Sequence, residues 1–233
     1  MKPGESTIRR MRVLIVDDHP MTRAGLAHMI NHQPDMIVSG EAESAAQALA
    51  ALEASEPDLM LVDITLPGKS GLELIKDLKA MHPGLPVLVI SMHDESLYAD
   101  RVLRAGARGY ITKHEGGEKL MRAIRCVLSG KIYVSENMSA HILEIFSRGQ
   151  TTPQRPAIEN LSDREFEVFE LIGEGLSARQ IAARLHLSAK TVDAHRANIK
   201  GKLEIKTSAE LISFAARWIT DRPGTKQTED GVT

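Results

Sequence analysis

The sequence predicts an α/β domain with a doubly wound, five-stranded parallel sheet, followed by a small all-α domain of four helices. Short apolar runs rich in Val, Ile and Leu alternate with helical patterns in the first half of the chain, as in parallel sheets buried on both faces. Only helical patterns follow the polar, proline-containing stretch at residues 149–156. With 233 residues and 42% hydrophobic content, the chain is long enough for two separate cores.

Strand and helix patterns repeat five times in the first domain, which predicts a flavodoxin-like fold. Pro20 fits the first turn of a helix, and Pro83 and Pro86 stop the third helix before the fourth strand. Right-handed crossovers would place helices on both faces of the sheet. The expected strands are residues 13–16, 36–42, 58–62, 87–91 and 108–111, and the expected helices are residues 20–30, 44–54, 71–82, 95–105 and 117–128.

Serine residues mark the helix starts of the second domain. Ser162 and Glu165 form a capping-box pattern, which predicts a first helix that ends near Gly173 or Gly175. The later helices are expected to begin at Ser177, Ser188 and Ser208. The predicted organisation is residues 10–128 for the α/β domain, 129–157 for a linker with a short helix at 140–146, 158–220 for the helical domain, and 221–233 for a flexible tail.

Composition excludes several classes of protein. The formal net charge of -2 argues against a wholly basic nucleic-acid coat or a polybasic membrane anchor. The single cysteine, Cys126, cannot form an internal disulfide and lies in a helical pattern, so we interpret it as core packing. The sequence has no apolar stretch long enough for a membrane span and no signal-peptide pattern, which favours a cytoplasmic protein without membrane contact.

Reactive side chains follow the ends of four expected strands. Parallel strands share one carboxyl edge, where ligands bind in doubly wound sheets, so these side chains should converge. The residues are Asp17 and Asp18, Asp63, Ser91, and Lys113. Clustered carboxylates favour Mg²⁺ beside a phosphoryl group. Asp63 is the candidate nucleophile for phosphorus, and Lys113 and Ser91 would hold the phosphoryl oxygens.

These residues together resemble the receiver domain of two-component response regulators over about residues 12–128. The resemblance implies that Asp63 accepts a phosphoryl group from a sensor histidine kinase, and that Ser91 and Tyr110 act as switch residues. It implies a Mg²⁺ site formed by Asp18, by Asp17 acting more through water, by Asp63 and by the backbone carbonyl of Thr65. His114 departs from the proline that many receivers have after the lysine, so we expect the loop there to differ in shape.

His93 follows Ser91 by two residues, at a position that often borders the phosphoryl site in receivers. We hypothesise that His93 and Thr65 control the lifetime of the phosphoryl group by limiting the access of water. The alternative is an ordinary surface histidine. The remaining histidines have no metal-ligand spacing and are expected to be surface or packing residues.

The second and third helices of the second domain form a helix-turn-helix pattern, with an excess of basic residues beyond the first helix. The sequence from Leu161 to Arg196 closely resembles the LuxR-type DNA-binding domain, which together with a receiver defines the NarL/FixJ family. The positions that contact base edges or phosphate in that family are here Lys190, Thr191, Asp193, Ala194, Arg196, Ala197, Asn198 and Lys200. Asp193 departs from a frequent lysine and could accept a hydrogen bond from cytosine.

The sequence therefore predicts a phosphorylation-controlled transcription factor rather than an enzyme. Its expected partners are a sensor histidine kinase, double-stranded promoter DNA, RNA polymerase and, when phosphorylated, a second copy of the chain. One alternative is a receiver whose helical module binds protein instead of DNA. Another is an enzyme of the haloacid dehalogenase type, but Thr65 stands where that family has a second aspartate.

Overall fold

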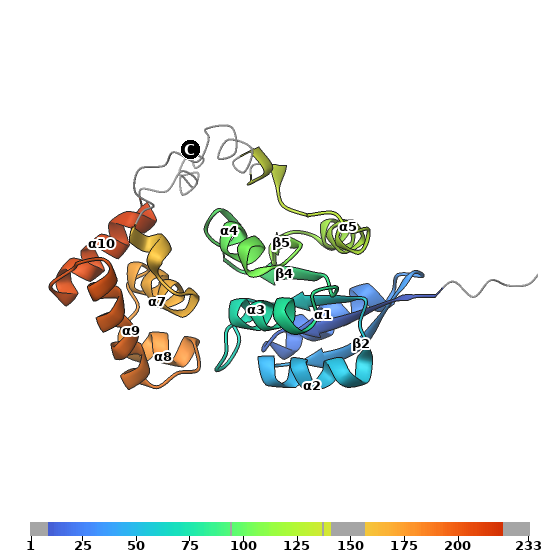
Figure 1. Cartoon of the computed structure of the whole chain (residues 1–233), viewed down its shortest axis with the longest axis horizontal. Coiled ribbons are helices and arrows are strands. Elements are labelled where there is room, and N and C mark those ends of the chain that lie inside the picture. Colours follow the sequence, from blue (N-terminus) through green and yellow to red (C-terminus); the bar gives the residue numbers. More distant parts are fainter. Residues whose placement is uncertain (1–8, 94, 137, 141–156, 221–233) are drawn as a thin grey trace, which may run out of the picture. The chain divides into compact units, whose positions relative to one another are not determined.

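The computed structural model describes residues 9–93, 95–136, 138–140 and 157–220, which form two compact units within residues 1–151 and 152–233 (Figure 1). The expected short helix at 140–146 apart from Ala140, most of the expected linker and the expected tail at 221–233 lie outside the described residues. Among the residues that are described, no helix is long and apolar enough to cross a membrane.

The first unit contains a five-stranded sheet in which every strand pair is parallel, as predicted. Its strands are β1 (Met11–Val16), β2 (Met36–Ala42), β3 (Leu59–Val62), β4 (Val87–Ser91) and β5 (Gly109–Thr112). The strand order is β2-β1-β3-β4-β5, so the chain direction across the sheet reverses beside β1 and β3. In doubly wound sheets this reversal leaves a crevice at the carboxyl ends of the central strands.

Four helices connect these strands and a fifth follows β5, and all five begin and end within two residues of the predicted limits. They are α1 (Pro20–Asn31), α2 (Ala45–Ser55), α3 (Gly71–Met81), α4 (Glu95–Ala105) and α5 (Gly117–Leu128). Ile30 of α1 and Ile124 of α5 share one buried cluster with Val13 and Leu61 of the sheet. Leu14, the neighbour of Val13, is equally buried, and since successive strand residues point to opposite faces, both faces of the sheet are covered.

The chain after α5 continues to pack against the sheet instead of leaving it at once. Tyr133 forms a parallel bridge with Gly109, and its carbonyl accepts a hydrogen bond of 2.9 Å from the amide of Tyr110. The amide of Ser135 donates to the Glu95 carboxylate of α4 at 2.8 Å. We expected a linker from residue 129, but these contacts hold Tyr133 against β5 and Ser135 against α4.

The second unit is entirely helical in its described part. It contains the 3₁₀ helix η1 (Ala157–Asn160) and helices α7 (Asp163–Gly173), α8 (Ala178–Arg184), α9 (Ala189–Lys202) and α10 (Ser208–Thr220). The predicted N-caps at Ser162, Ser177 and Ser188 accept hydrogen bonds from the third residue of the following helix. Phe166 and Phe169 of α7 pack against Trp218 of α10, with ring centroids 5.6 and 5.3 Å apart.

Candidate functional site

The polar residues at the strand ends converge because β1, β3, β4 and β5 are consecutive neighbours in the sheet. The backbone continues this pairing beyond the strands. The Asp63 amide donates to the carbonyl of Val16 at 2.8 Å, and the Lys113 amide donates to the carbonyl of Ser91 at 2.7 Å. The loops that carry the predicted site residues are therefore held in register by main-chain hydrogen bonds.

Gly71, the first residue of α3, allows α3 to begin close behind Asp63. A side chain at this glycine would place its Cβ 2.0 Å from the Asp63 carbonyl oxygen. The Gly71 amide donates to the carbonyl of Ile64 at 2.7 Å. Only a residue without a Cβ fits there, so Gly71 lets the start of α3 pack against the main chain of Asp63 and Ile64.

Lys113 bridges two carboxylates at the centre of the site. Its Nζ atom lies 2.6 Å from Oδ2 of Asp63 and 2.7 Å from Oδ2 of Asp17. Both aspartate side chains are almost completely buried, so their charges need a partner. One ammonium group thus faces two carboxylates, which leaves the local charge negative.

Burial and the neighbouring charges shift the pKa values of Asp63 and Lys113. Burial, together with the charge of Asp17, raises the pKa of Asp63 to about 6, although Lys113 acts in the opposite direction. Burial would lower the pKa of Lys113, but the carboxylates of Asp63 and Asp17 outweigh that effect and raise it. A cation bound beside Asp63 would favour its ionised form.

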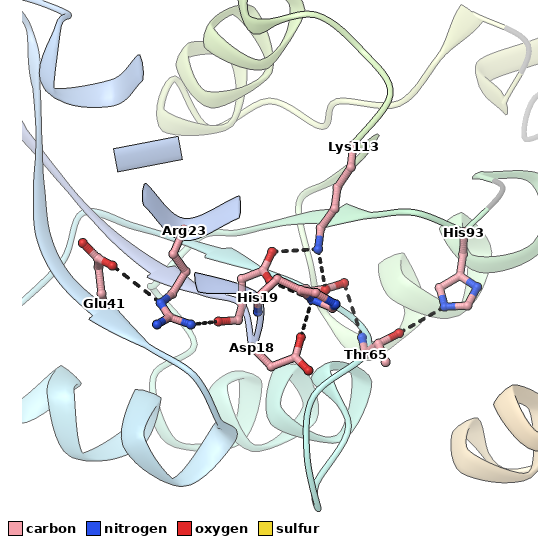
Figure 2. A network of polar contacts seen from close by, with 9 residues as sticks. Asp18, His19, Arg23, Glu41, Thr65, His93 and Lys113 are labelled. Carbon is pink, nitrogen blue, oxygen red and sulfur yellow. Dashed lines mark hydrogen bonds and ion pairs between the residues drawn. The ribbon is translucent and has the colours of Figure 1, made fainter. Parts of the chain in front are cut away.

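Asp18 and His19 complete the acidic cluster on the α1 side. Nδ1 of His19 lies 2.6 Å from Oδ1 of Asp18 and 3.3 Å from Oδ1 of Asp17 (Figure 2). One ligand atom from each of Asp17, Asp18, His19 and Asp63 lies within 4.8 Å of the others. Carboxylates gathered this closely repel one another, and their oxygens suit a hard divalent cation, so the three aspartates fit Mg²⁺.

Arg23 of α1 binds the main chain of the loop that carries Asp17 and Asp18. Its Nη1 atom donates to the Asp17 carbonyl at 2.7 Å, and its Nε lies 3.5 Å from a Glu41 carboxylate oxygen (Figure 2). Neither Arg23 nor His19 was expected from the sequence to be a site residue. The only sequence feature that points to these two residues is the predicted helix start after Asp17 and Asp18. The contact of Arg23 with Glu41 of β2 depends on the folded sheet, so the sequence does not reveal it.

Thr65 and His93 meet on the opposite side of Asp63. The Thr65 amide donates to Oδ1 of Asp63 at 3.3 Å, and the Thr65 hydroxyl lies 3.1 Å from Nε2 of His93 (Figure 2). The two residues that we expected to limit water access are therefore in contact. The His93 ring also lies 4.7 Å from that of Tyr98 in α4, so His93 is more than an isolated surface residue.

Ser91 and Tyr110 are both buried and both bond to His93. The Ser91 hydroxyl accepts a hydrogen bond of 3.2 Å from the amide of His93. The hydroxyl of Tyr110 donates to the carbonyl of His93 at 2.8 Å. The two predicted switch residues are thus joined through the main chain of one residue, and a movement of the loop at His93 would affect both.

The recognition helix predicted in the second unit is α9, whose inward face is formed by Val192 and Ile199. Most of the predicted DNA-contacting residues are exposed, and Arg196 and Lys200 are half-buried. The exposed residues are Lys190, Thr191, Asp193, Ala194, Ala197 and Asn198. The Thr191 hydroxyl lies 2.7 Å from that of the N-cap, Ser188, so Thr191 also contributes to the start of the helix.

Two protein families match this chain. Residues 13–125 match the response regulator receiver domain, and residues 159–215 match the bacterial regulatory proteins of the luxR family. The oxygen regulatory protein NreC of Staphylococcus aureus is 35% identical over 211 residues, covering 89% of this chain and 97% of the relative.

Solved structures of response regulators are similar to this chain over different shares of its length. A LuxR-family two-component response regulator from Aurantimonas is 32% identical, covering 59% of this chain and 99% of that one, with a TM-score of 0.55. RcsB of Salmonella enterica serovar Typhimurium, bound to the rprA promoter in the presence of the phosphomimetic BeF3⁻, is 25% identical with a TM-score of 0.60. That match covers 89% of this chain and 99% of RcsB.

Proposed function

This chain belongs to the NarL/FixJ family of response regulators, and from that membership we propose that phosphorylation of Asp63 controls the binding of promoter DNA by α9. Members of this family are DNA-binding transcription regulators and not enzymes, and the same holds for this protein. The proposed domains are a receiver at residues 10–128, a linker at 129–157, a DNA-binding domain at 158–220 and a tail at 221–233. DNA is the target, so we expect the protein to act in the cytoplasm.

The proposed chemistry is the transfer of a phosphoryl group from a phosphohistidine of a sensor kinase. An oxygen of Asp63 attacks the phosphorus, the new O–P bond forms as the P–N bond breaks, and the leaving imidazole takes a proton from solvent. Lys113, 2.6 Å from the Asp63 carboxylate, supports this role because its ammonium can move to a phosphoryl oxygen. The Ser91 hydroxyl would donate to another phosphoryl oxygen.

Asp17, Asp18, Asp63 and the backbone carbonyl of Thr65 are the proposed ligands of Mg²⁺. When bound, the ion offsets negative charge on the aspartates and on the incoming phosphoryl group. The raised pKa of Asp63 is consistent with a site adapted to an additional cation. Without that cation, part of the Asp63 population is protonated near neutral pH and is a poor nucleophile.

The proposed switch begins at Ser91. If its hydroxyl turns toward the phosphoryl group, the bond from the His93 amide to Ser91 breaks, and the loop that also holds the Tyr110 hydroxyl is displaced. A change of this loop and of Tyr110 would alter the surface formed by α4, β5 and α5. This change is proposed to free α9 or to promote dimerisation, which would allow two DNA half-sites to be bound together.

Exposed and half-buried residues of α9 are proposed to contact DNA. The set comprises Lys190, Thr191, Asp193, Ala194, Arg196, Ala197, Asn198 and Lys200. The basic members would bind phosphate or guanine, whereas Asn198 can form paired hydrogen bonds with adenine. RNA polymerase is a further proposed partner, as expected for a protein that acts on transcription.

The single observation that carries this proposal is the burial of Asp63 beside Lys113 and Asp17 at the carboxyl edge of the sheet. Intact-protein mass spectrometry after incubation with acetyl phosphate and Mg²⁺ tests it. Wild type should gain one phosphoryl group, and Asp63→Asn should gain none. Asp100→Asn, which removes a carboxylate of α4 from a surface ion pair with Arg104, should be modified like wild type. Equal modification of Asp63→Asn would reject Asp63 as the acceptor.

A further inference from the structure

His19 lies where a ligand of the proposed cation would lie. Its Nδ1 atom is 2.6 Å from Oδ1 of Asp18 and 3.3 Å from Oδ1 of Asp17. In an octahedral shell with metal–ligand bonds of about 2.1 Å, neighbouring ligand atoms are about 3.0 Å apart and opposite ones about 4.2 Å. The distance from Nδ1 to Oδ1 of Asp17 is close to the first value, whereas the distance to Oδ1 of Asp18 is that of a hydrogen bond. The four donor atoms lie within 4.8 Å of one another, somewhat more than the second value, so the side chains would move closer together when a cation binds. The imidazole nitrogen already lies among the ligand atoms.

The backbone holds His19 in this position. The His19 amide donates to Oδ1 of Asp17 at 2.8 Å, and His19 is the N-cap of α1. Its side chain makes no capping hydrogen bond with the helix, so the ring is available for other interactions. The ring is 63% exposed, which lets it rotate and lets hydrated ions reach it from solvent.

We propose that Nδ1 of His19 is an additional ligand of the cation bound by Asp17, Asp18 and Asp63, and that it makes the site prefer Mn²⁺ to Mg²⁺. This inference rests on the proposed function, since it concerns the same site. A receiver site made only of oxygen ligands suits Mg²⁺, which binds nitrogen poorly. Imidazole suits the transition metals, whose affinities for a mixed nitrogen and oxygen site exceed that of Mg²⁺.

The remaining groups around the site are compatible with this arrangement. Lys113 approaches Asp17 and Asp63 through their Oδ2 atoms, whereas His19 lies beside the Oδ1 atoms of Asp17 and Asp18. The ammonium and the cation would therefore contact different carboxylate oxygens of Asp17. Arg23 contacts the main-chain carbonyl of Asp17 and leaves its carboxylate available.

The competing possibility is that His19 only donates a hydrogen bond to Asp18 and moves away when a cation binds. Electron spin echo spectroscopy of bound Mn²⁺ distinguishes the two, because a directly coordinated nitrogen modulates the echo and a distant one does not. The experiment uses the full-length protein, His19→Gln, and His28→Gln as a control on the exposed surface of α1. Affinities for Mn²⁺ come from the signal of the free ion, and those for Mg²⁺ from competition.

We expect nitrogen coupling in wild type and in His28→Gln but not in His19→Gln. We also expect His19→Gln to lose about tenfold in Mn²⁺ affinity, as is typical for perturbed metal sites, while Mg²⁺ affinity stays within about threefold. Bound Mn²⁺ without nitrogen coupling, or an unchanged ratio of the two affinities in His19→Gln, would overturn this inference and leave the proposed Mg²⁺ site intact. Asp18→Asn, which removes a proposed ligand, should bind neither ion. If wild type also binds neither ion, the proposed cation site itself is wrong.

Discussion

The Nζ atom of Lys113, beyond the end of β5, lies 2.6 Å from Oδ2 of Asp63, beyond the end of β3, although the two residues are 50 positions apart in sequence. This contact exists because β4, whose neighbours are β3 and β5, brings both loops to one edge of the sheet. The same ammonium also faces Asp17, so two buried carboxylates share one positive charge. The stability and the reactivity of the receiver are therefore linked through these groups.

Asp63→Asn should stabilise the protein at neutral pH in the absence of divalent cations. The pKa of Asp63 is raised from 3.8 to about 6, so between these values the folded state holds a proton that the unfolded state has lost. The free energy of unfolding should fall as pH rises through this window and level off above about pH 6. The advantage of the neutral asparagine should reach at most about 3 kcal/mol at pH 7 and vanish below about pH 4.

Urea unfolding of both proteins in EDTA at several pH values measures this difference. Asp100→Asn is the matched control, because its carboxylate lies in a surface ion pair. A stability difference between wild type and Asp63→Asn that does not change from pH 4 to pH 7 would show that the buried carboxylate titrates normally.

Lys113→Gln should destabilise the receiver, and Mg²⁺ should restore part of the loss. The substitution leaves the carboxylates of Asp17 and Asp63 buried without their ammonium partner, which should cost about 2–4 kcal/mol when Asp63 is ionised. Thermal unfolding in EDTA and in excess Mg²⁺ tests both statements. Lys113→Gln should cost less stability in the Asp63→Asn background than in wild type, and an equal cost in the two backgrounds would argue against the coupling of the two residues.

His93→Ala should shorten the lifetime of the phosphorylated state. His93 contacts the Thr65 hydroxyl beside Asp63, so its removal opens a path for water to the phosphoryl group. We expect the dephosphorylation rate to rise about three- to tenfold, which corresponds to roughly 1 kcal/mol of barrier height. Loss of the mass of the phosphoryl group with time gives the rate. His82→Ala, an exposed histidine at the end of α3, should behave like wild type, and an unchanged rate in His93→Ala would end the hypothesis.

Lys190→Ala should weaken DNA binding and lower its dependence on salt. Lys190 is exposed in the first turn of α9, where a recognition helix meets DNA. If it contacts a phosphate, the slope of log affinity against log salt should fall by about one, with similar losses on all DNA sequences. Fluorescence anisotropy at several salt concentrations measures the slope, with Lys131→Ala in the first unit as the control. A loss confined to sites with one particular base would instead identify Lys190 as a base-reading residue.

Local signals in the sequence predicted most of the element boundaries. Pro20 begins α1, and Ser162, Ser177 and Ser188 cap helices of the second unit where expected, because a cap depends on residues within one turn. The order of buried apolar strands predicted the parallel sheet. The convergence of Asp17, Asp63 and Lys113 followed from that topology alone.

The sequence did not reveal contacts between segments that no periodicity or capping motif relates to one another. The bridge from Tyr133 to Gly109 depends on how the chain turns after α5. In the sequence, His19 is one of several scattered histidines, and only the start of α1 directs its ring to Asp18. The need for glycine at position 71 arises from the carbonyl of Asp63 eight positions earlier, a clash that no local propensity describes.

The most direct test of this account is the binding of the full-length protein to a pool of genomic DNA fragments, with and without acetyl phosphate and Mg²⁺, for wild type and Asp63→Asn. We predict that phosphorylated wild type retains a specific set of fragments more tightly than unphosphorylated wild type, and that Asp63→Asn does not respond. Equal binding in all samples would contradict control of DNA affinity by Asp63, and binding in none would contradict DNA recognition by α9.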